Sequence, residues 1–237
     1  MPGRIERTYG KLFRYVMHII NPFKKSIIKT ECIIHQFINI QALEILKNDN
    51  FLDAYFFFSD HIVQLNAGVI WADQDFKSVG HFYNPTRGKG LYGNNNALLL
   101  GEGYFGKSLE FWKIGDIDMS MFYLGAAAHI VQDMTVPQHA NIRLLDDHRQ
   151  YENFIKRAYL HTPAFTVNKG GYYLSGINEI IRCNARNAMR IYRKLRNIED
   201  DEKRFYTIAK FTLPLAQKTT AGCLLDFYKD AFKKINL

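Results

Sequence analysis

The chain has 237 residues, of which 47% are hydrophobic and 23% are charged, with a formal net charge of +8. This composition predicts a soluble globular protein, and no apolar run approaches the roughly 18 to 20 uncharged residues needed to span a bilayer. The basic charge suits phospholipid surfaces or nucleic acid without choosing between them, and equally a solvated surface without a partner. Three cysteines, Cys32, Cys183 and Cys223, are far apart and odd in number, which predicts reduced thiols rather than a disulfide framework.

Residues 1–29 form a basic N-terminal segment whose short apolar part is broken by Arg14 and His18. The segment lacks the uninterrupted apolar core and the small-residue cleavage site of a signal peptide, so the sequence does not indicate secretion. We expect a helix packed on the domain, a helix lying on a membrane surface, or a segment trimmed from the mature chain.

From residue 30 onward, apolar residues recur with helical spacing. The spacing predicts a first helix over residues 30–49, with Thr30 as its N-cap, and a continuous helix over residues 51–71. Residues 84–108 are rich in glycine and asparagine, which predicts a long loop with at most a short helix.

A strongly apolar helix is expected over residues 116–134, and Pro137 stops it. The last of the later helices is expected to kink or break near Pro214. The later helices are expected at residues 148–160, 176–197 and 202–232. Without an alternating strand pattern or an internal repeat, the prediction is one all-α domain over residues 30–237, a bundle of about eight to ten helices.

The apolar run from Gly125 to Ala140, which includes the end of this helix, contains three polar residues that need an explanation: His129, Asp133 and His139. Residues four apart share one helical face and lie about 6 Å apart along the axis, so His129 and Asp133 can hold one metal ion. Because Pro137 ends the helix, His139 leaves in a new direction and can serve a neighbouring ion. The alternative is that the three side chains satisfy one another in a core.

Similar residues recur elsewhere in the chain. His148 and Glu152 repeat the four-residue spacing, which is also common in surface helix pairs. Upstream, Asp73, Asp75 and His81 lie close together in sequence, and His35 interrupts the apolar face of its helix.

Five of the eight histidines fall in these groups together with several carboxylates. Imidazole and carboxylate without thiolate is the ligand set of hydrolytic zinc sites, and the ligands are too many for one ion. A site with more than one metal ion is therefore expected.

Several segments resemble the bacterial zinc-dependent phospholipases C, whose catalytic domain is an all-helical bundle. The resemblance covers about residues 30–230, and the joint pattern is specific. The segments that carry it are FYLGAAAHIVQDMTVPQHA, HRQYENFI, HFYNP, IWADQD, HQFINIQALEIL and QKTTAGCLLDFY. In HFYNP, Asn84 stands where the family usually has aspartate.

The resemblance implies ligands for three zinc ions. Asp73, His81, His129 and Asp133 would bind the first ion. His139, His148 and Glu152 would bind the second. His35 and a bridging Asp133 would bind the third. Asp75 is expected beside the ligands, or as the ligand itself if the alignment shifts by two residues.

The resemblance also implies the reaction: cleavage of the glycerol–phosphate ester of a phospholipid to diacylglycerol and a phosphorylated head group. A zinc-activated water would attack phosphorus, with Asp73 as general base. The expected partner is a phospholipid or membrane surface, and no obligate protein partner is predicted. The family suggests a secreted or cell-surface protein. The chain's start leaves a cytoplasmic or membrane-peripheral location open.

This chain departs from the family at two places. The family's third site is completed by an N-terminal tryptophan, but here that region is Pro22 to Lys25 and holds none. Trimming near Phe23, a substitute ligand such as His18, or a weak or absent third site would each explain this, so two to three zinc ions are expected. The aromatics of choline-preferring members are replaced by Gln74 and Ser78, so a choline cage is not predicted.

Two other functions stay open. S1/P1-type single-strand nucleases share this fold and the first histidine–aspartate segment, and a basic chain suits nucleic acid. However, their last pair usually ends in aspartate rather than Glu152, their histidine spacing is longer, and they tend to carry disulfides. A metal-stabilised, non-catalytic protein of the membrane surface is the other alternative.

Overall fold

Helices make up the architecture in the computed structural model, which describes residues 32–74, 77–91, 95–143 and 147–233. Within these ranges there are nine α-helices, two short 3-10 helices and no β-strand, which confirms the predicted all-α class. Their bounds are α2 (Ile33–Asn48), α3 (Leu52–Asp60), α4 (Ile62–Asp73), η1 (Lys77–Gly80), α5 (Ala97–Lys113), α6 (Ile117–Asp133), α7 (Pro137–Asn141), α8 (His148–Ala158), η2 (Pro163–Phe165), α9 (Ile177–Leu195) and α10 (Asp201–Ala231). None of the described helices combines the length and the hydropathy needed to cross a membrane.

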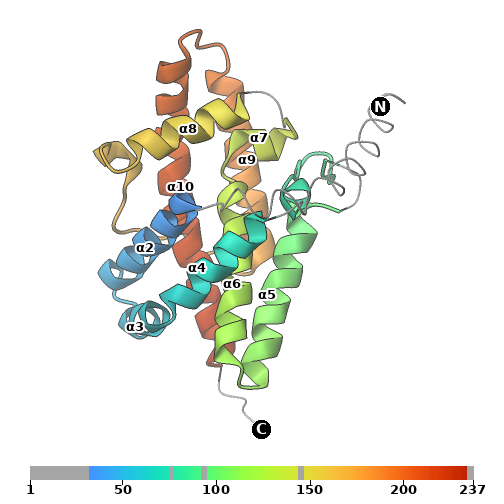
Figure 1. The fold of residues 1–237 in the computed structure, drawn as a ribbon, viewed down its shortest axis with the longest axis vertical. Helices are drawn as coiled ribbons and strands as arrows, with labels where there is room; N and C mark the ends of the chain where they lie inside the picture. The colour runs from blue at the N-terminus through green and yellow to red at the C-terminus, as the bar shows by residue number, and fades with distance from the viewer. Residues whose placement is uncertain (1–31, 75–76, 92–94, 144–146, 234–237) are drawn as a thin grey trace, which may run out of the picture.

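Helix α6 lies in the middle of the bundle and packs most extensively against α4 and α5 (Figure 1). Asp116 caps its start, because its carboxylate accepts a hydrogen bond from the Met119 amide at 3.1 Å. Every residue from Gly125 to Asp133 is buried, so the polar side chains of this stretch lie inside the protein. The large core around them is built mainly from α2 to α6, α9 and α10.

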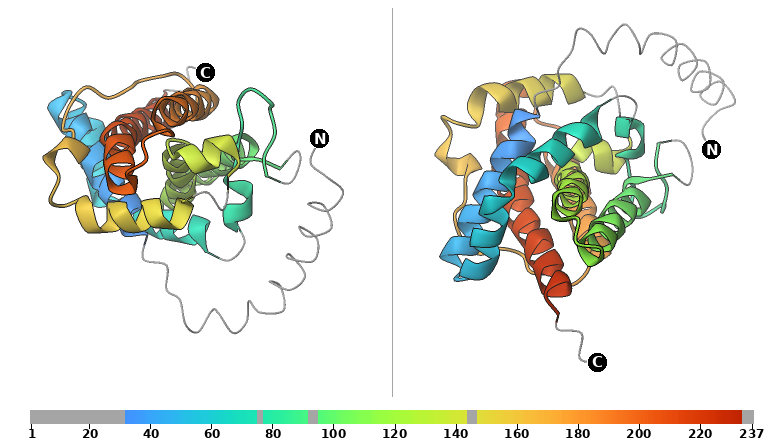
Figure 2. Two further views of the ribbon diagram at one scale, coloured as in Figure 1. Left: turned by 90° about the horizontal axis from the view of Figure 1, so that it is seen from above. Right: turned by 60° about the horizontal axis from the view of Figure 1, so that its bottom comes forward.

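Helix α8 is attached to the bundle through a second, smaller core that it shares with α2 and the first half of α10. Tyr151 lies in this core at 1% exposure, and its hydroxyl is 2.8 Å from the hydroxyl of Thr212 on α10. Figure 1 shows α7 and α8 in the upper part of the bundle, and the right-hand view of Figure 2 shows α8 crossing above the start of α2. The packing of Tyr151 therefore fixes the position of α8.

The single helix predicted over residues 51–71 is wrong, because the chain turns at His61. This residue ends α3 and begins α4, and its backbone angles (φ −112°, ψ 16°) are not helical. Figure 1 shows α3 nearly end-on beside α4, so the two helices run in different directions. The predicted cap Thr30 lies outside the described residues.

Two further predictions are corrected by the structure. The loop predicted over residues 84–108 ends early, because Asn96 caps α5 by accepting a hydrogen bond from the Leu99 amide at 3.2 Å. Of the two outcomes predicted at Pro214, a break is wrong, because α10 continues through it, and a kink stays a prediction. Proline removes the hydrogen bond to the carbonyl of Lys210, but Lys210 is exposed, so water can take the place of the missing donor.

Candidate metal centre

The last turn of α6 holds the centre of a buried polar cluster. His129 is 1% exposed and Asp133 is 4% exposed, and His129 Nε2 lies 3.1 Å from Asp133 Oδ2. The four-residue spacing places both side chains on one face of the helix. The local geometry thus allows both to reach one ion.

A first group gathers around His129 from the end of α4 and the segment after η1. Ligand atoms of Asp73, His81 and His129 lie within 4.8 Å of one another. Asp73 is the last residue of α4, and Cys32 donates a thiol hydrogen bond to its Oδ2 at 3.4 Å. His81 is fully buried, and its Nδ1 donates to Asp133 Oδ2 at 2.7 Å. These contacts leave His81 Nε2, which has no hydrogen-bond partner among the described residues, as the ring nitrogen that could bind a metal.

A second group joins α2 to α6. Ligand atoms of His35, His129 and Asp133 also lie within 4.8 Å of one another. His35 Nε2 is 3.6 Å from Asp133 Oδ1, and the rings of His35 and His129 are stacked with centroids 4.1 Å apart. Asp133 therefore presents one oxygen to His35 and the other to His81.

A third set of side chains comes from α7 and α8. His139 Nδ1 donates to the backbone carbonyl of His81 at 3.1 Å. The ring of His139 meets the ring of His148 edge-on, with centroids 4.8 Å apart. His148 Nε2 lies 3.2 Å from Glu152 Oε1 across one turn of α8. The carbonyl contact links this set to the first group.

Several buried nitrogens in the cluster fit a metal ion. The described residues supply no hydrogen-bond partner for His81 Nε2, His129 Nε2 or His148 Nε2. The last two are close to carboxylates but not aligned with them for a hydrogen bond. A buried polar atom without a partner costs about 1–3 kcal/mol, and a metal bond to the imidazole lone pair removes that cost. Imidazole nitrogen and carboxylate oxygen are ligands that zinc accepts.

The electrostatics of the cluster favour the protonation states that a metal needs. Burial opposes ionisation of Asp133, but the charges of His129 and His139 hold the pKa of this carboxyl well below its usual range. Burial lowers the pKa of His139 to about 4. Burial, followed by the charge of His129, also lowers the pKa of His35. At neutral pH His35 and His139 are therefore neutral and Asp133 is ionised, as metal ligation requires.

For His129, and for His148 and Glu152 on α8, the neighbouring charged group rather than burial sets the direction of the pKa shift. Burial opposes the charged form of His129, but Asp133 outweighs it and raises its pKa. Burial also opposes charging of His148, yet contact with Glu152 raises its pKa. Burial alone would raise the pKa of Glu152, but contact with His148 outweighs it, so the pKa of Glu152 is lowered. His129 and His148 therefore keep a proton to a higher pH than a free imidazole does, and a bound cation would displace that proton.

The structure brings eight of the predicted side chains into one region around the end of α6. They are His35, Asp73, His81, His129, Asp133, His139, His148 and Glu152. Asp75 and His18 lie outside the described residues. Sequence reasoning did not place Cys32, Asn39 or Gln132 at the site, where they contact members of the cluster or each other. Asn39 follows His35 by four residues on the same helical face, which is the signal that would have found it.

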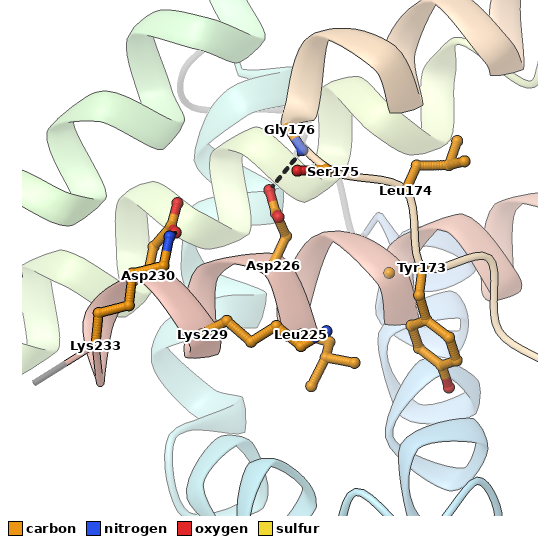
Figure 3. Close-up of a pocket in the computed structure, with 10 residues that line it drawn as sticks. Tyr173, Leu174, Ser175, Gly176, Leu225, Asp226, Lys229, Asp230 and Lys233 are labelled. Atoms are coloured by element: carbon orange, nitrogen blue, oxygen red, sulfur yellow. Dashed lines mark hydrogen bonds and ion pairs between the residues drawn. The ribbon is translucent and has the colours of Figure 1, made fainter.

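A pocket on the surface is separate from this cluster. It lies between the segment before α9 and the last turns of α10, where the Gly176 amide donates to Asp226 at 3.1 Å (Figure 3). Its lining includes Ser175, Asp226 and Lys229 but none of the candidate metal ligands. The pocket therefore adds nothing to the metal chemistry.

A model of the family described as zinc-dependent phospholipase C matches residues 34–212. A phospholipase C of Listeria monocytogenes is 30% identical over 128 residues, which cover 50% of this chain and 44% of the relative. A phospholipase C of Clostridium novyi is 23% identical over 237 residues, covering 85% of this chain and 60% of the relative. This chain thus spans between 44% and 60% of the length of these curated relatives.

Two solved structures share the fold. The alpha toxin of Clostridium absonum has a TM-score of 0.73 at 20% identity, over 85% of this chain and 64% of the toxin. The alpha-toxin of Clostridium perfringens has a TM-score of 0.71 at 22% identity, over 84% of this chain and 63% of that toxin. At these identities the likeness concerns the architecture of the bundle.

Proposed function

Because the chain belongs to the zinc-dependent phospholipase C family, we propose that it is a zinc metallohydrolase acting on phospholipids. It would cleave the glycerol–phosphate ester and release diacylglycerol and a phosphorylated head group. The observation that carries this proposal is the buried cluster at the end of α6, where imidazole nitrogens without partners face ionised carboxylates. We further propose that residues 30–237 form the catalytic domain, preceded by the basic segment 1–29.

The ligand assignment follows the groups in space. Asp73, His81 and His129 would hold one ion together with Asp133. His139, His148 and Glu152 would hold a second. His35 and Asp133 would hold a third, with Asp133 shared. When bound, zinc offsets the developing charge on the phosphate oxygens and lowers the pKa of a water towards 7.

Asp73 is the proposed general base. It is half-buried at the end of α4, so it can reach both the cluster and solvent. Its carboxylate would accept the proton from the water whose oxygen bonds to phosphorus. The bond from phosphorus to the glycerol oxygen would break, and that oxygen would take a proton from solvent water to give diacylglycerol. The Cys32 thiol donates to Asp73 Oδ2, which holds this carboxylate in one orientation.

Parallel assays of the zinc-loaded chain test the proposal. Vesicles of several pure phospholipids and single-stranded DNA would be incubated with the same preparation, and diacylglycerol, phosphorylated head group and DNA fragments would be measured. We expect lipid cleavage that a chelator abolishes. DNA cleavage alone would establish the nuclease instead, and a zinc-loaded chain inactive on both would indicate the non-catalytic alternative.

A matched pair of variants ties the activity to the cluster. His148→Gln removes a proposed ligand, whereas His161→Gln changes an exposed histidine outside the cluster. We expect the first variant to lose lipid cleavage and the second to keep it. Equal activity of the two variants would contradict the proposed site.

A further inference from the structure

A chain of side-chain hydrogen bonds runs from His35 away from the metal cluster. His35 Nδ1 lies 2.8 Å from Gln132 Oε1. Gln132 Nε2 donates to Asn39 Oδ1 at 2.8 Å, and Asn39 Nδ2 donates to Asn66 Oδ1 at 2.9 Å. The bonds run from α2 to α6, return to α2 at Asn39 and end on α4 at Asn66.

The two middle members are buried in a largely apolar core. Gln132 and Asn39 are each 1% exposed. A buried amide without partners costs about 1–3 kcal/mol per group, so both must keep their hydrogen bonds. Neither amide can rotate alone, because each rotation would set two donors or two acceptors face to face.

The direction of the chain determines which nitrogen of His35 carries the proton. A primary amide has one oxygen that accepts and one nitrogen that donates. Because Gln132 donates to Asn39, it presents its oxygen to His35 Nδ1. That nitrogen must then carry the hydrogen, which leaves the lone pair on Nε2, 3.6 Å from Asp133 Oδ1. The reversed chain would put the proton on Nε2 and prevent it from binding a metal.

We propose that Gln132 and Asn39 are positioning residues that keep His35 in the Nδ1–H form with its Nε2 lone pair aimed at the ion shared with Asp133. Gln132 acts on His35 directly, and Asn39 acts by orienting Gln132. The identity of the ion as zinc rests on the proposed function. The tautomer and the direction of the amide chain do not depend on it.

The tautomer can be measured without metal or substrate. Long-range ¹H–¹⁵N correlation spectra of the metal-free full chain distinguish Nδ1–H from Nε2–H for each histidine ring, and a His35→Gln spectrum assigns the signals. We expect His35 of the parent chain to carry its proton on Nδ1. A parent His35 that carries it on Nε2 would overturn the proposal.

Two substitutions at Gln132 separate orientation from packing. Gln132→Glu keeps an oxygen for His35 Nδ1–H, and Asn39 can turn its amide so that its Nδ2 donates to the other carboxylate oxygen. Gln132→Met keeps the size but removes the acceptor. We expect Nδ1 to stay protonated in the glutamate variant and the two tautomers to mix in the methionine variant. Gln64→Met makes the same change on α4, where Gln64 binds the exposed Asp118, and should leave His35 unaltered.

Zinc titration gives the functional readout. Loss of a residue that orients a ligand typically weakens metal binding 10- to 100-fold, so the weakest zinc site of Gln132→Met should weaken by that amount. The glutamate variant should stay within a few-fold of the parent. If Gln132→Met keeps both the parent tautomer and the parent zinc affinity, Gln132 has only a packing role and the proposal is wrong.

Variants at Asn39 give a second test if Gln132→Met does not fold. Asn39→Asp still accepts from Gln132, so His35 should keep its proton on Nδ1. Asn39→Leu releases the Gln132 amide, so His35 should mix its tautomers; an unchanged tautomer would overturn the role of Asn39. A parent chain with the expected tautomer but no lipid cleavage would refute the proposed function and leave this inference standing.

Discussion

Gly125 on α6 lies directly against the backbone of Leu65 on α4: a Cβ atom on Gly125 would lie 2.0 Å from the Leu65 carbonyl oxygen. Gly68 makes the reciprocal contact, because its Cβ would lie 1.8 Å from the carbonyl oxygen of Phe122. No side chain separates the two helices here. This close approach brings Asp73, about two turns beyond Leu65, to His129, about one turn beyond Gly125.

Gly125→Ala should therefore push α4 away from α6. We expect the free energy of unfolding to fall by about 1–3 kcal/mol or more, because backbone cannot move aside as a flexible side chain can. Zinc content should fall as well, since Asp73 moves relative to His129. Urea unfolding and metal analysis measure both quantities.

The control for this prediction is Gly103→Ala. Gly103 lies inside α5, and a Cβ there would meet nothing within 4 Å. Alanine in an exposed helix interior should stabilise the protein by about 0.5–1 kcal/mol relative to glycine. Equal effects of the two substitutions would show that the α4–α6 contact is unimportant.

Asp73→Asn should lower the rate of phospholipid cleavage by about 10²- to 10⁴-fold, because an amide cannot accept the proton of the attacking water. The measurement is the release of phosphorylated head group from vesicles, with zinc content determined on the same sample. Asp53→Asn changes an exposed aspartate on α3 and should keep the parent rate. An Asp73→Asn protein with full zinc content and full activity would disprove the role.

Glu152→Gln should reduce the zinc content by about one ion per chain, because it removes the charged oxygen that faces His148 on α8. Glu202→Gln is the matched change, since Glu202 lies on the surface 3.8 Å from Arg157. Metal analysis after dialysis against a weak chelator compares the two variants with the parent. Retention of all zinc by Glu152→Gln would exclude this carboxylate as a ligand.

The metal-free chain should lose stability as the pH falls from about 6.5 to 4. Burial lowers the pKa of His139 to about 4, whereas the unfolded chain binds the same proton at about 6.5. Between these values the unfolded state holds more protons, so the free energy of unfolding rises with pH, by at most about 3 kcal/mol for this group. Below pH 4 both states are protonated and the effect levels off.

His148 acts in the opposite sense, so the parent's pH profile alone does not isolate His139. Glu152 outweighs burial and raises the pKa of His148, so its stabilising contribution is present at low pH and is lost as the pH rises through that raised pKa. The quantity to compare is the free energy of unfolding from urea titrations, measured at each pH for the parent and for His139→Gln. His161→Gln, an exposed change, should follow the parent. If the free energy of unfolding has the same pH dependence in the parent and in His139→Gln, the prediction is contradicted.

The local part of the site could be predicted from spacing, because His129 with Asp133 and His148 with Glu152 are each one helical turn apart. The contact between His81 and Asp133 joins residues 52 positions apart, and no periodicity predicts it. Its expectation came from the family resemblance. Which oxygen of Asp133 faces which histidine needed the structure.

The error in the loop predicted over residues 84–108 is connected with packing between distant segments. Glycine-rich sequence near residue 101 predicts a loop, yet Gly101 lies inside α5, where a Cβ would be 2.4 Å from the Ile181 side chain on α9. Glycine fits the narrow space between α5 and α9 at this position. The sequence alone does not show that α9 packs there.

The arrangement of the cluster also has a consequence for biosynthesis. Its side chains come from α2, α4, α6, α7, α8 and the segment after η1, so the first candidate ligand leaves the ribosome long before the last. At about 5–20 residues per second, His35 precedes Glu152 by on the order of ten seconds. No early portion of the nascent chain contains the complete ligand set. Full metal loading must therefore follow the emergence and docking of α8, and a chain that stalls before this helix would be released without the His148–Glu152 pair.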